Sequence, residues 1–384
     1  DGRAEYTYRK GDGFEFLYIV NVEKEPARVV VPAGYSRVDL LSLKAYEQER
    51  EIVLGGGESI LLMPVSGEKG ISYGAEKELT SEFRFAGATD NNLTLDMVQI
   101  SFDGVAYGEE EPLAEVFDRL LRAQYEGKLY VKYSFTVKGT GTKLALRREK
   151  GKYLSSSLNG RALDFTESAY DFLLEEADIS ATVREGTNEY INELNFYERP
   201  HVFWALYAPE ATESVRNCLW YDTELENIYL RGDFSVNGER ALMPPAAPER
   251  MDNMQKNGFP NFAGKVKFSA AVFGEKKRAK LKVEGDYTSV EVFVNGREAG
   301  SFLFGKEIEI ELKEGGENAL EIAAVSSLRN MFGPLHFKGD EDEGVGPFSF
   351  TMRGAWKEGK CEYYAPDYRI RPFGVSAVKI AFEK

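Results

Sequence analysis

Cysteine and histidine are scarce in this sequence, and their scarcity excludes several kinds of site. The 384 residues include two cysteines, Cys218 and Cys361, and two histidines, His201 and His336. The cysteines form no C-x-x-C pair and neither histidine belongs to an H-E-x-x-H motif, so a zinc cage of sulfur or imidazole ligands is not expected. We expect two buried thiols rather than a disulfide.

An excess of positive charge and long hydrophobic runs are also missing. Lys and Arg number 48 against 63 Asp and Glu, which gives a formal net charge of -15. Such a surface repels phosphate backbones and anionic lipid, so neither nucleic acid nor a membrane is an expected partner. No apolar run approaches the roughly 18–20 residues that span a bilayer.

The beginning of the sequence has no basic segment followed by an apolar one, as a secretory leader would have. The first residue is Asp1 rather than Met, so we expect a processed chain or a piece of a longer one. Nothing in the composition fixes the location, and we favour an extracellular or periplasmic location over a cytoplasmic one.

What the sequence does contain is a succession of short β-rich runs separated by turn residues. Runs of this kind lie at 14–20, 59–63, 93–102, 129–137 and 190–194. One helix is expected between Pro112 and Gly127, where Leu113, Val116 and Leu120 repeat at helical spacing. Strands and helices do not alternate, which argues against a TIM barrel or a Rossmann sheet.

A diverged internal repeat is the most informative feature. Its first copy contains segments 133–137, 143–147, 157–161, 184–188 and 232–235, and its second contains 268–272, 279–283, 293–297, 313–318 and 346–349. Asn159-Gly160 and Asn295-Gly296 predict tight hairpins, because both residue types tolerate positive φ. Strands that bury one face each must stack as two sheets. We therefore predict an all-β fold of tandem antiparallel jelly-roll sandwiches at 70–240 and 241–384, after a small β domain at 1–65.

The closing part of the repeat carries a family resemblance. Residues 292–300 contain V-N-G-x-x-x-G, and L-K-x-x-G-x-N-x-L-x-I follows at 312–322. This pattern resembles the sugar-binding β-sandwich of family 2 glycoside hydrolases, a galactose-binding-like domain. Segments 219–234 and 327–336 are similar to C-terminal regions of large bacterial glycosidases of the α-L-rhamnosidase family 106 kind. In those proteins a catalytic (β/α)₈ barrel precedes a small β domain, which residues 1–65 resemble, and then the sandwiches.

The resemblance implies an accessory region of a glycoside hydrolase that acts on plant or bacterial glycans. Its expected partners are carbohydrate, which it would bind, and the catalytic barrel of the same parent polypeptide, which it would brace. The family's catalytic carboxylates have no counterpart positions here, so we assign no catalytic residue. Two alternatives stay open: a free-standing carbohydrate-binding protein, and an adhesion or scaffold sandwich that binds protein.

Sugar recognition uses aromatic faces and planar polar groups, which gives a short set of candidates. They are Trp356, Trp204, Trp220, Arg329, Asn330 and His336. A structural role competes with sugar binding at each position. A tryptophan is more often buried or between domains, and the Ser-x-Arg-Asn segments at 214–217 and 327–330 suit hydrogen bonds to backbone carbonyls.

Two acidic segments suggest further chemistry. Asp222, Glu224 and Glu226 offer an acid/base cluster for glycoside hydrolysis, although a solvated charge group is favoured. The run 340–343, Asp-Glu-Asp-Glu, offers a Ca²⁺ site, but it lacks the spaced order of an EF-hand loop, and a solvated loop is favoured. Ca²⁺ is thus the one cofactor under consideration, and none is assigned.

Overall fold

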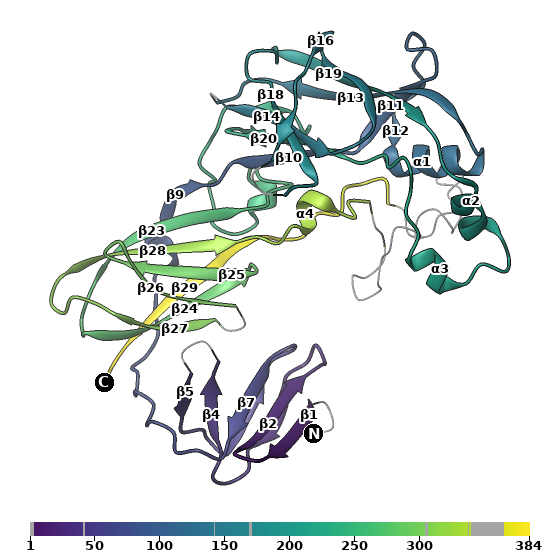
Figure 1. Ribbon diagram of the computed structural model, residues 1–384. Coiled ribbons are helices and arrows are strands. Elements are labelled where there is room, and N and C mark those ends of the chain that lie inside the picture. Colours follow the sequence, from purple (N-terminus) through teal and green to yellow (C-terminus); the bar gives the residue numbers. More distant parts are fainter. Residues whose placement is uncertain are drawn as a thin grey trace.

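Antiparallel β-strands dominate the chain in this computed structural model (Figure 1). The structure describes residues 4–40, 43–141, 143–168, 171–303, 306–336, 338 and 365–384. The predicted all-β fold of stacked antiparallel sheets is confirmed. Trp356, Cys361, the acidic run 340–343 and the repeat segment 346–349 lie outside the described residues. No helix in the described part of the chain is long and apolar enough to cross a bilayer.

The N-terminal unit, residues 4–68, contains two small sheets. One has the strand order β1-β2-β7-β4-β5, and the other pairs β3 with β6. The strands are β1 (Ala4–Gly11), β2 (Phe14–Asn21), β3 (Ala27–Val30), β4 (Ser36–Asp39), β5 (Lys44–Tyr46), β6 (Glu51–Leu54) and β7 (Ser59–Met63). Because successive side chains of a strand point to opposite faces, Ile19, Ile60 and Leu62 turn together into a small core.

The first sandwich stacks two sheets on one core. Its smaller sheet contains, in order, β10 (Asn91–Leu95), β20 (Ile228–Gly232), β14 (Leu144–Glu149), β18 (Leu174–Asp178) and β17 (Thr166–Glu167). Its larger sheet contains β12 (Glu111–Pro112), β11 (Met97–Ser101), β13 (Gly127–Val137), β19 (Gly186–Phe196), β15 (Tyr153–Leu158) and β16 (Arg161–Ala162), with β21 (Ser235–Val236) and β22 (Leu242–Met243) attached. Along β13, alternate side chains from Leu129 to Val137 are buried between the sheets.

Helices cover one end of this sandwich. The predicted helix is confirmed as α1 (Leu113–Arg122), which follows Pro112 and buries Leu113, Val116, Leu120 and Leu121 against the core. Two shorter helices, α2 (Pro200–Tyr207) and α3 (Glu213–Asn217), follow β19. They carry the chain from the end of β19 towards β20 (Figure 1).

The second sandwich also stacks two sheets. One contains, in order, β26 (Arg297–Phe302), β25 (Ser289–Val294), β28 (Glu317–Val325), β23 (Lys265–Phe273) and β9 (Arg84–Ala88). The other contains β27 (Glu307–Glu311), β24 (Arg278–Asp286), β29 (Gly374–Phe382) and β8 (Lys77–Glu78). The short helices η1 (Thr80–Glu82), η2 (Met254–Lys256) and α4 (Arg329–Phe332) lie between strands.

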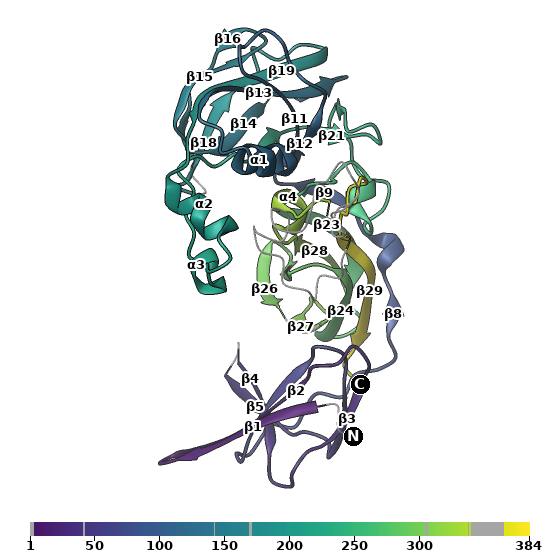
Figure 2. The same ribbon diagram turned by 90° about the vertical axis from the view of Figure 1, so that its right-hand side faces the viewer.

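Strands β8 and β9 come before the first sandwich in sequence but belong to the sheets of the second. Val266 of β23 pairs with Ala88 of β9, and Lys379 of β29 pairs with Glu78 of β8. Phe83, between these two strands, is buried in the core of the second sandwich. Figure 2 shows β8 and β9 running alongside this sandwich before the chain enters the first. The division of the chain at 65, 70 and 240 stays a prediction.

Each of the two sandwiches contains a pair of hydrogen-bonded asparagines, at corresponding positions of the repeat. In the first, the Asn159 amide donates to the Asn188 side-chain oxygen (2.8 Å), and the backbone N–H of Glu189 donates to Asn159 (3.1 Å). In the second, Asn295 donates to Asn318 (2.9 Å), and the N–H of Ala319 donates to Asn295 (2.9 Å). Asn159 and Asn295 each begin an Asn-Gly hairpin turn at positive φ, 52° and 51°. The predicted hairpins are confirmed.

Candidate functional site

A pocket opens on the first sandwich, where the end of β14 meets the segment between α3 and β20. Its volume is about 220 Å³. One wall is the turn 149–153, and the other is formed by residues 221–224 together with Glu226. We call it the acidic pocket, because Glu149, Glu224 and Glu226 line it and carboxylate oxygens of all three lie within 4.8 Å of one another.

Strand register brings these distant residues together. β14 pairs antiparallel with β20, so that Leu144 lies opposite Gly232 and Arg147 opposite Tyr229. Continuing the same register places Glu149 beside the residues just before β20, which include Glu226. The Tyr133 hydroxyl donates a hydrogen bond to the Glu226 carbonyl (2.9 Å) and so fixes this segment to the larger sheet.

The environment of the three carboxyl groups favours their protonated form. Burial, and then the charges of Glu149 and Glu224, raise the pKa of Glu226 to about 8. Burial is also the main cause of the raised pKa of Glu149, with Glu224 and Asp171 adding to it, and burial raises the pKa of Glu224. Glu226 is therefore mostly a neutral acid at pH 7, which differs from the solvated charge group that the sequence favours.

Asp222, which the sequence groups with Glu224 and Glu226, has different partners. Its carboxylate accepts hydrogen bonds from the Arg199 backbone N–H (3.0 Å) and from the Arg199 guanidinium (3.1 Å). The buried Glu198 carboxylate accepts from the backbone N–H groups of Asp222 (2.8 Å) and Thr223 (3.0 Å). Residues 198 and 199 thus hold this wall of the pocket in place.

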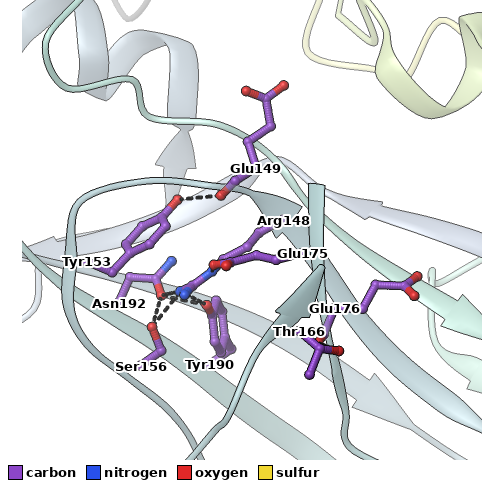
Figure 3. A network of polar contacts seen from close by, with 9 residues as sticks. All are labelled: Arg148, Glu149, Tyr153, Ser156, Thr166, Glu175, Glu176, Tyr190 and Asn192. Carbon is purple, nitrogen blue, oxygen red and sulfur yellow. Dashed lines mark hydrogen bonds and ion pairs between the residues drawn. The ribbon is translucent and has the colours of Figure 1, made fainter. Parts of the chain in front are cut away.

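A buried arginine supports the opposite wall. The Arg148 guanidinium lies 3.8 Å from the centre of the Tyr153 ring and 3.7 Å from that of Phe165. It donates to Glu175 (2.7 Å), Tyr190 (2.8 Å) and Asn192 (2.8 Å). Figure 3 shows this network, with the neighbouring Glu149 side chain pointing away from it. Because Tyr153 lines the acidic pocket, Arg148 fixes the position of one of its aromatic rings.

The tryptophans predicted as sugar platforms lie in different places. The Trp220 side chain is 77% exposed, and Trp220 directly precedes Tyr221, which lines the acidic pocket. The Trp204 side chain on α2 is 39% exposed, is stacked on the His201 ring, and donates from Nε1 to Glu210 (3.1 Å). Trp356 lies outside the described residues. Of the three, Trp220 is the one that adjoins a pocket residue in the sequence.

The predicted polar candidates lie at the junction between the sandwiches instead. The buried Asn330 amide donates to the Arg371 carbonyl (2.9 Å), and the Arg371 N–H donates back to the Asn330 side chain (2.9 Å). Arg329 begins α4, where the Thr94 hydroxyl of β10 donates to the Met331 carbonyl (2.7 Å). The role of these residues in sugar binding stays a prediction.

His336 is buried at the same junction. Its Nε2 lies 3.2 Å from the Asp96 carboxylate, and its Nδ1 lies 2.9 Å from the Ala365 carbonyl. The Tyr368 hydroxyl donates to the other Asp96 oxygen (2.7 Å), and the Arg240 guanidinium stacks on the Tyr368 ring at 3.8 Å. Burial acts to lower the pKa of His336, but Asp96 and the Ala365 carbonyl outweigh it, so this pKa is raised.

The two Ser-x-Arg-Asn segments have different surroundings, although the sequence predicts a shared structural role. Residues 327–330 lead into α4 at the junction, where Asn330 is buried. Residues 214–217 lie in α3, none of whose residues is buried, and the Arg216 guanidinium donates to the Ala205 carbonyl (3.1 Å). The repeated Ser-x-Arg-Asn motif therefore does not make the same contacts at its two positions.

The acidic pocket can hold either a cation or polar groups of a small ligand. Glu149, Glu224 and Glu226 each offer one carboxylate oxygen to a shared metal ion. Ca²⁺ takes six to eight oxygen ligands, so water or ligand hydroxyls would have to complete such a site. The same carboxylates can accept hydrogen bonds from hydroxyl groups, and the rings of Tyr153 and Tyr221 give the pocket aromatic surface.

Sequence reasoning found part of this pocket. It singled out Glu224 and Glu226 from their spacing, and it missed Glu149, Tyr153 and Tyr221. The charged run Arg147-Arg148-Glu149-Lys150 at the end of a predicted strand was an available signal. Its relevance depends on the pairing of β14 with β20, which spacing alone does not specify.

Of three comparisons with known proteins, only the comparison with solved structures found similar proteins. No protein-family model matches the chain, and no curated protein matches it. The rhamnosidase from Novosphingobium sp. PP1Y is 15% identical with a TM-score of 0.24, over 59% of this chain and 24% of that one. The β-glucuronidase of Ruminococcus gnavus is 15% identical with a TM-score of 0.27, over 62% and 42%. The β-D-mannosidase from Dictyoglomus thermophilum is 12% identical with a TM-score of 0.26, over 61% and 31%.

The matched region is less than half the length of each of these chains. All three proteins are glycoside hydrolases by name, and identities and TM-scores at this level carry no inference of activity for this chain. The family membership that the sequence predicts therefore stays a prediction.

Proposed function

We propose that this chain is an accessory, carbohydrate-binding region of a glycoside hydrolase and that it binds sugar at the acidic pocket. The observation that carries the proposal is that two tyrosine rings and convergent carboxyl groups line one pocket of the first sandwich. The exposed indole of Trp220 belongs to the residue that precedes Tyr221, one of these two tyrosines. Aromatic faces and a few convergent polar groups are what a sugar requires of its site.

The roles of the residues follow from their chemistry. Trp220 would stack on the C–H face of a sugar ring at the rim. Glu149 and Glu224 would accept hydrogen bonds from sugar hydroxyls, and the protonated Glu226 would donate one. The volume of about 220 Å³ is below the roughly 300–1,000 Å³ of drug-sized ligand sites. One sugar residue, rather than a longer glycan, would enter the pocket.

We further propose that the pocket does not hydrolyse glycosides. A glycosidase places its two carboxyl groups on either side of the scissile bond, about 5–5.5 Å or 6.5–9.5 Å apart. Here the carboxylate oxygens of Glu149, Glu224 and Glu226 approach within 4.8 Å from adjacent backbone segments. They form one cluster of three mutually close carboxyl groups, at a separation below both of these spacings.

Binding is tested by calorimetric titration of the full chain with a panel of mono- and oligosaccharides, chosen from glycan-array hits. Trp220→Ala should weaken binding about tenfold, because the variant loses roughly 0.5–1.5 kcal/mol of aromatic stacking together with the apolar area that the indole covers. Phe273→Ala, which removes an exposed ring from β23 of the second sandwich, is the matched control and should leave affinity unchanged. Unchanged affinity in Trp220→Ala would remove the pocket rim from the binding site.

Catalysis is tested separately with aryl glycosides. No turnover is expected from the 384-residue chain. Turnover that disappears in Glu226→Gln would contradict the accessory role and make the acidic pocket an active site.

A further inference from the structure

Strand β1 forms a free edge of the N-terminal sheet. It pairs with β2 along one side, from Ala4 opposite Asn21 to Gly11 opposite Phe14. Among the described residues, no strand pairs with its other side. Every residue from Glu5 to Gly11 is exposed. Such an edge presents a row of backbone donors and acceptors that another strand can pair with.

Both faces of this edge strand carry side chains that can interact with an added strand. Tyr6 and Tyr8 lie opposite Ile19 and Leu17 of β2, and so share the face of the sheet that forms the core. Tyr6 is 73% exposed and Tyr8 is 44% exposed. The core face of the sheet therefore continues onto two tyrosine rings that the described residues leave exposed.

The opposite face of β1 carries charges arranged about its centre. Glu5 and Arg9 lie two residues before and two residues after Thr7, and all three side chains point to the same face. If a second β1 pairs antiparallel with the first about Thr7, Glu5 of each copy lies opposite Arg9 of the other. The same register places Tyr6 of each copy opposite Tyr8 of the other. Opposite charges and aromatic pairs are favourable cross-strand neighbours.

We propose that β1 is a dimerisation edge, through which two copies of this chain join their five-stranded N-terminal sheets into one continuous sheet. The two-fold axis passes perpendicular to the sheet at Thr7, so the interface is isologous and leaves neither β1 edge free. Parallel pairing in register would place Glu5 against Glu5 and Arg9 against Arg9, so the charges select the antiparallel arrangement. This interface is independent of the acidic pocket, and either proposal can fail without the other.

A charge-reversal experiment on the full chain tests the proposed register. Sedimentation velocity should show concentration-dependent dimer formation by the wild type at about 100 µM, since a contact this small gives a weak dimer. Glu5→Arg and Arg9→Glu each place like charges opposite one another and should weaken self-association at least tenfold. Mixing these two variants restores both pairs, so they should associate one to one. Arg28→Glu, at an exposed arginine of β3, is the charge-matched control and should dimerise like the wild type.

A cross-link tests the position of the axis. Thr7→Cys, in a chain with Cys218 and Cys361 replaced by serine, should form an intermolecular disulfide on mild oxidation, whereas Glu5→Cys should do so much more slowly. A wild type that stays monomeric at all accessible concentrations would overturn the proposal. So would a dimer that both single charge reversals leave unchanged.

Discussion

At the scale of single residues, the acidic pocket places a carboxyl group where its charge is costly. Glu226 is half-buried, and its pKa of about 8 lies well above the value of 4.5 of an ordinary glutamate. The unfolded chain loses the Glu226 proton near pH 4.5, whereas the folded chain keeps it until about pH 8. Folding therefore becomes less favourable as the pH rises between these two values.

Glu226→Gln should remove this pH dependence. Gln keeps the size and polarity of the protonated acid but cannot ionise, so the variant should match the wild type at pH 4. At pH 9 it should be the more stable by about 2 kcal/mol, given that one pKa unit corresponds to about 1.4 kcal/mol and that Glu226 keeps some access to water. Urea unfolding at several pH values measures this difference. A difference that is the same at pH 4 and pH 9 would contradict the raised pKa.

At the scale of structural elements, the paired asparagines explain how a strongly diverged repeat keeps one turn geometry. The buried Asn188 side chain donates to the carbonyls of Arg184 and Gly186 and accepts from the N–H of Arg184. The buried Asn318 side chain makes the same three bonds, to Lys313 and Gly316. Each closes the turn that precedes its strand by satisfying backbone groups that lie away from water.

Replacing either buried asparagine should be strongly destabilising. Asn188→Ala and Asn318→Ala leave several backbone groups without partners, and each orphaned group costs about 1–3 kcal/mol. We expect a loss of about 2–4 kcal/mol in the free energy of unfolding for each variant. Asn195→Ala, at an exposed position of β19, should change the free energy by less than about 0.5 kcal/mol. Denaturant titration compares the three; equal effects at positions 195 and 318 would show that the buried hydrogen bonds add little.

The sequence predicted those elements whose signal is local. The Asn-Gly hairpins, the helix α1 and the alternation along β13 each depend on residues that are close in the chain. The crossing of β8 and β9 into the second sandwich was not predicted. β8 has two residues and β9 has the sequence Arg-Phe-Ala-Gly-Ala, and neither carries a pattern that names its distant partner.

The acidic pocket, too, could be predicted from the sequence only where its residues are close together in the chain. Glu224 and Glu226 could be predicted as a cluster because they are two residues apart in the sequence. Glu149 joins them through the antiparallel register of β14 and β20, and Arg148 matters because it is buried against Tyr153. Both facts are tertiary. The register arises when strands distant in sequence pair within one sheet, and the contact of Arg148 with Tyr153 arises when the two sheets stack.

At the scale of the whole molecule, the contact between the two sandwiches includes a histidine, His336, whose protonation affects the stability of the folded chain. His336, next to the second sandwich, faces Asp96 of the first, with Tyr368, Arg240 and the Ala365 carbonyl around them. Since the pKa of His336 is raised above 6.5, protonation stabilises the folded chain. This contribution is fully present below about pH 6.5 and is lost as the pH rises through the higher pKa of the folded state.

His336→Gln should therefore destabilise the chain most under acidic conditions. The difference in melting temperature between wild type and variant should be larger at pH 5.5 than at pH 9. Comparing the two proteins at each pH cancels the titration of groups they share, Glu226 included. Asp96→Asn should likewise reduce the pH dependence, because it removes the charge that holds the proton. A pH-independent difference for His336→Gln would contradict a charged pair at this junction.

The placement of β8 and β9 also sets an order of events during synthesis. A ribosome makes both strands before the first sandwich, but β23 begins only at Lys265 and β29 only at Gly374. At about 5–20 residues per second, β9 must wait roughly ten to forty seconds for its partner. The first sandwich can close during that interval, whereas the second cannot. The later sandwich is thus completed by its earliest strands. On the nascent chain β9 must stay unpaired until β23 has been made, and β8 until β29 has been made, close to the last of these residues.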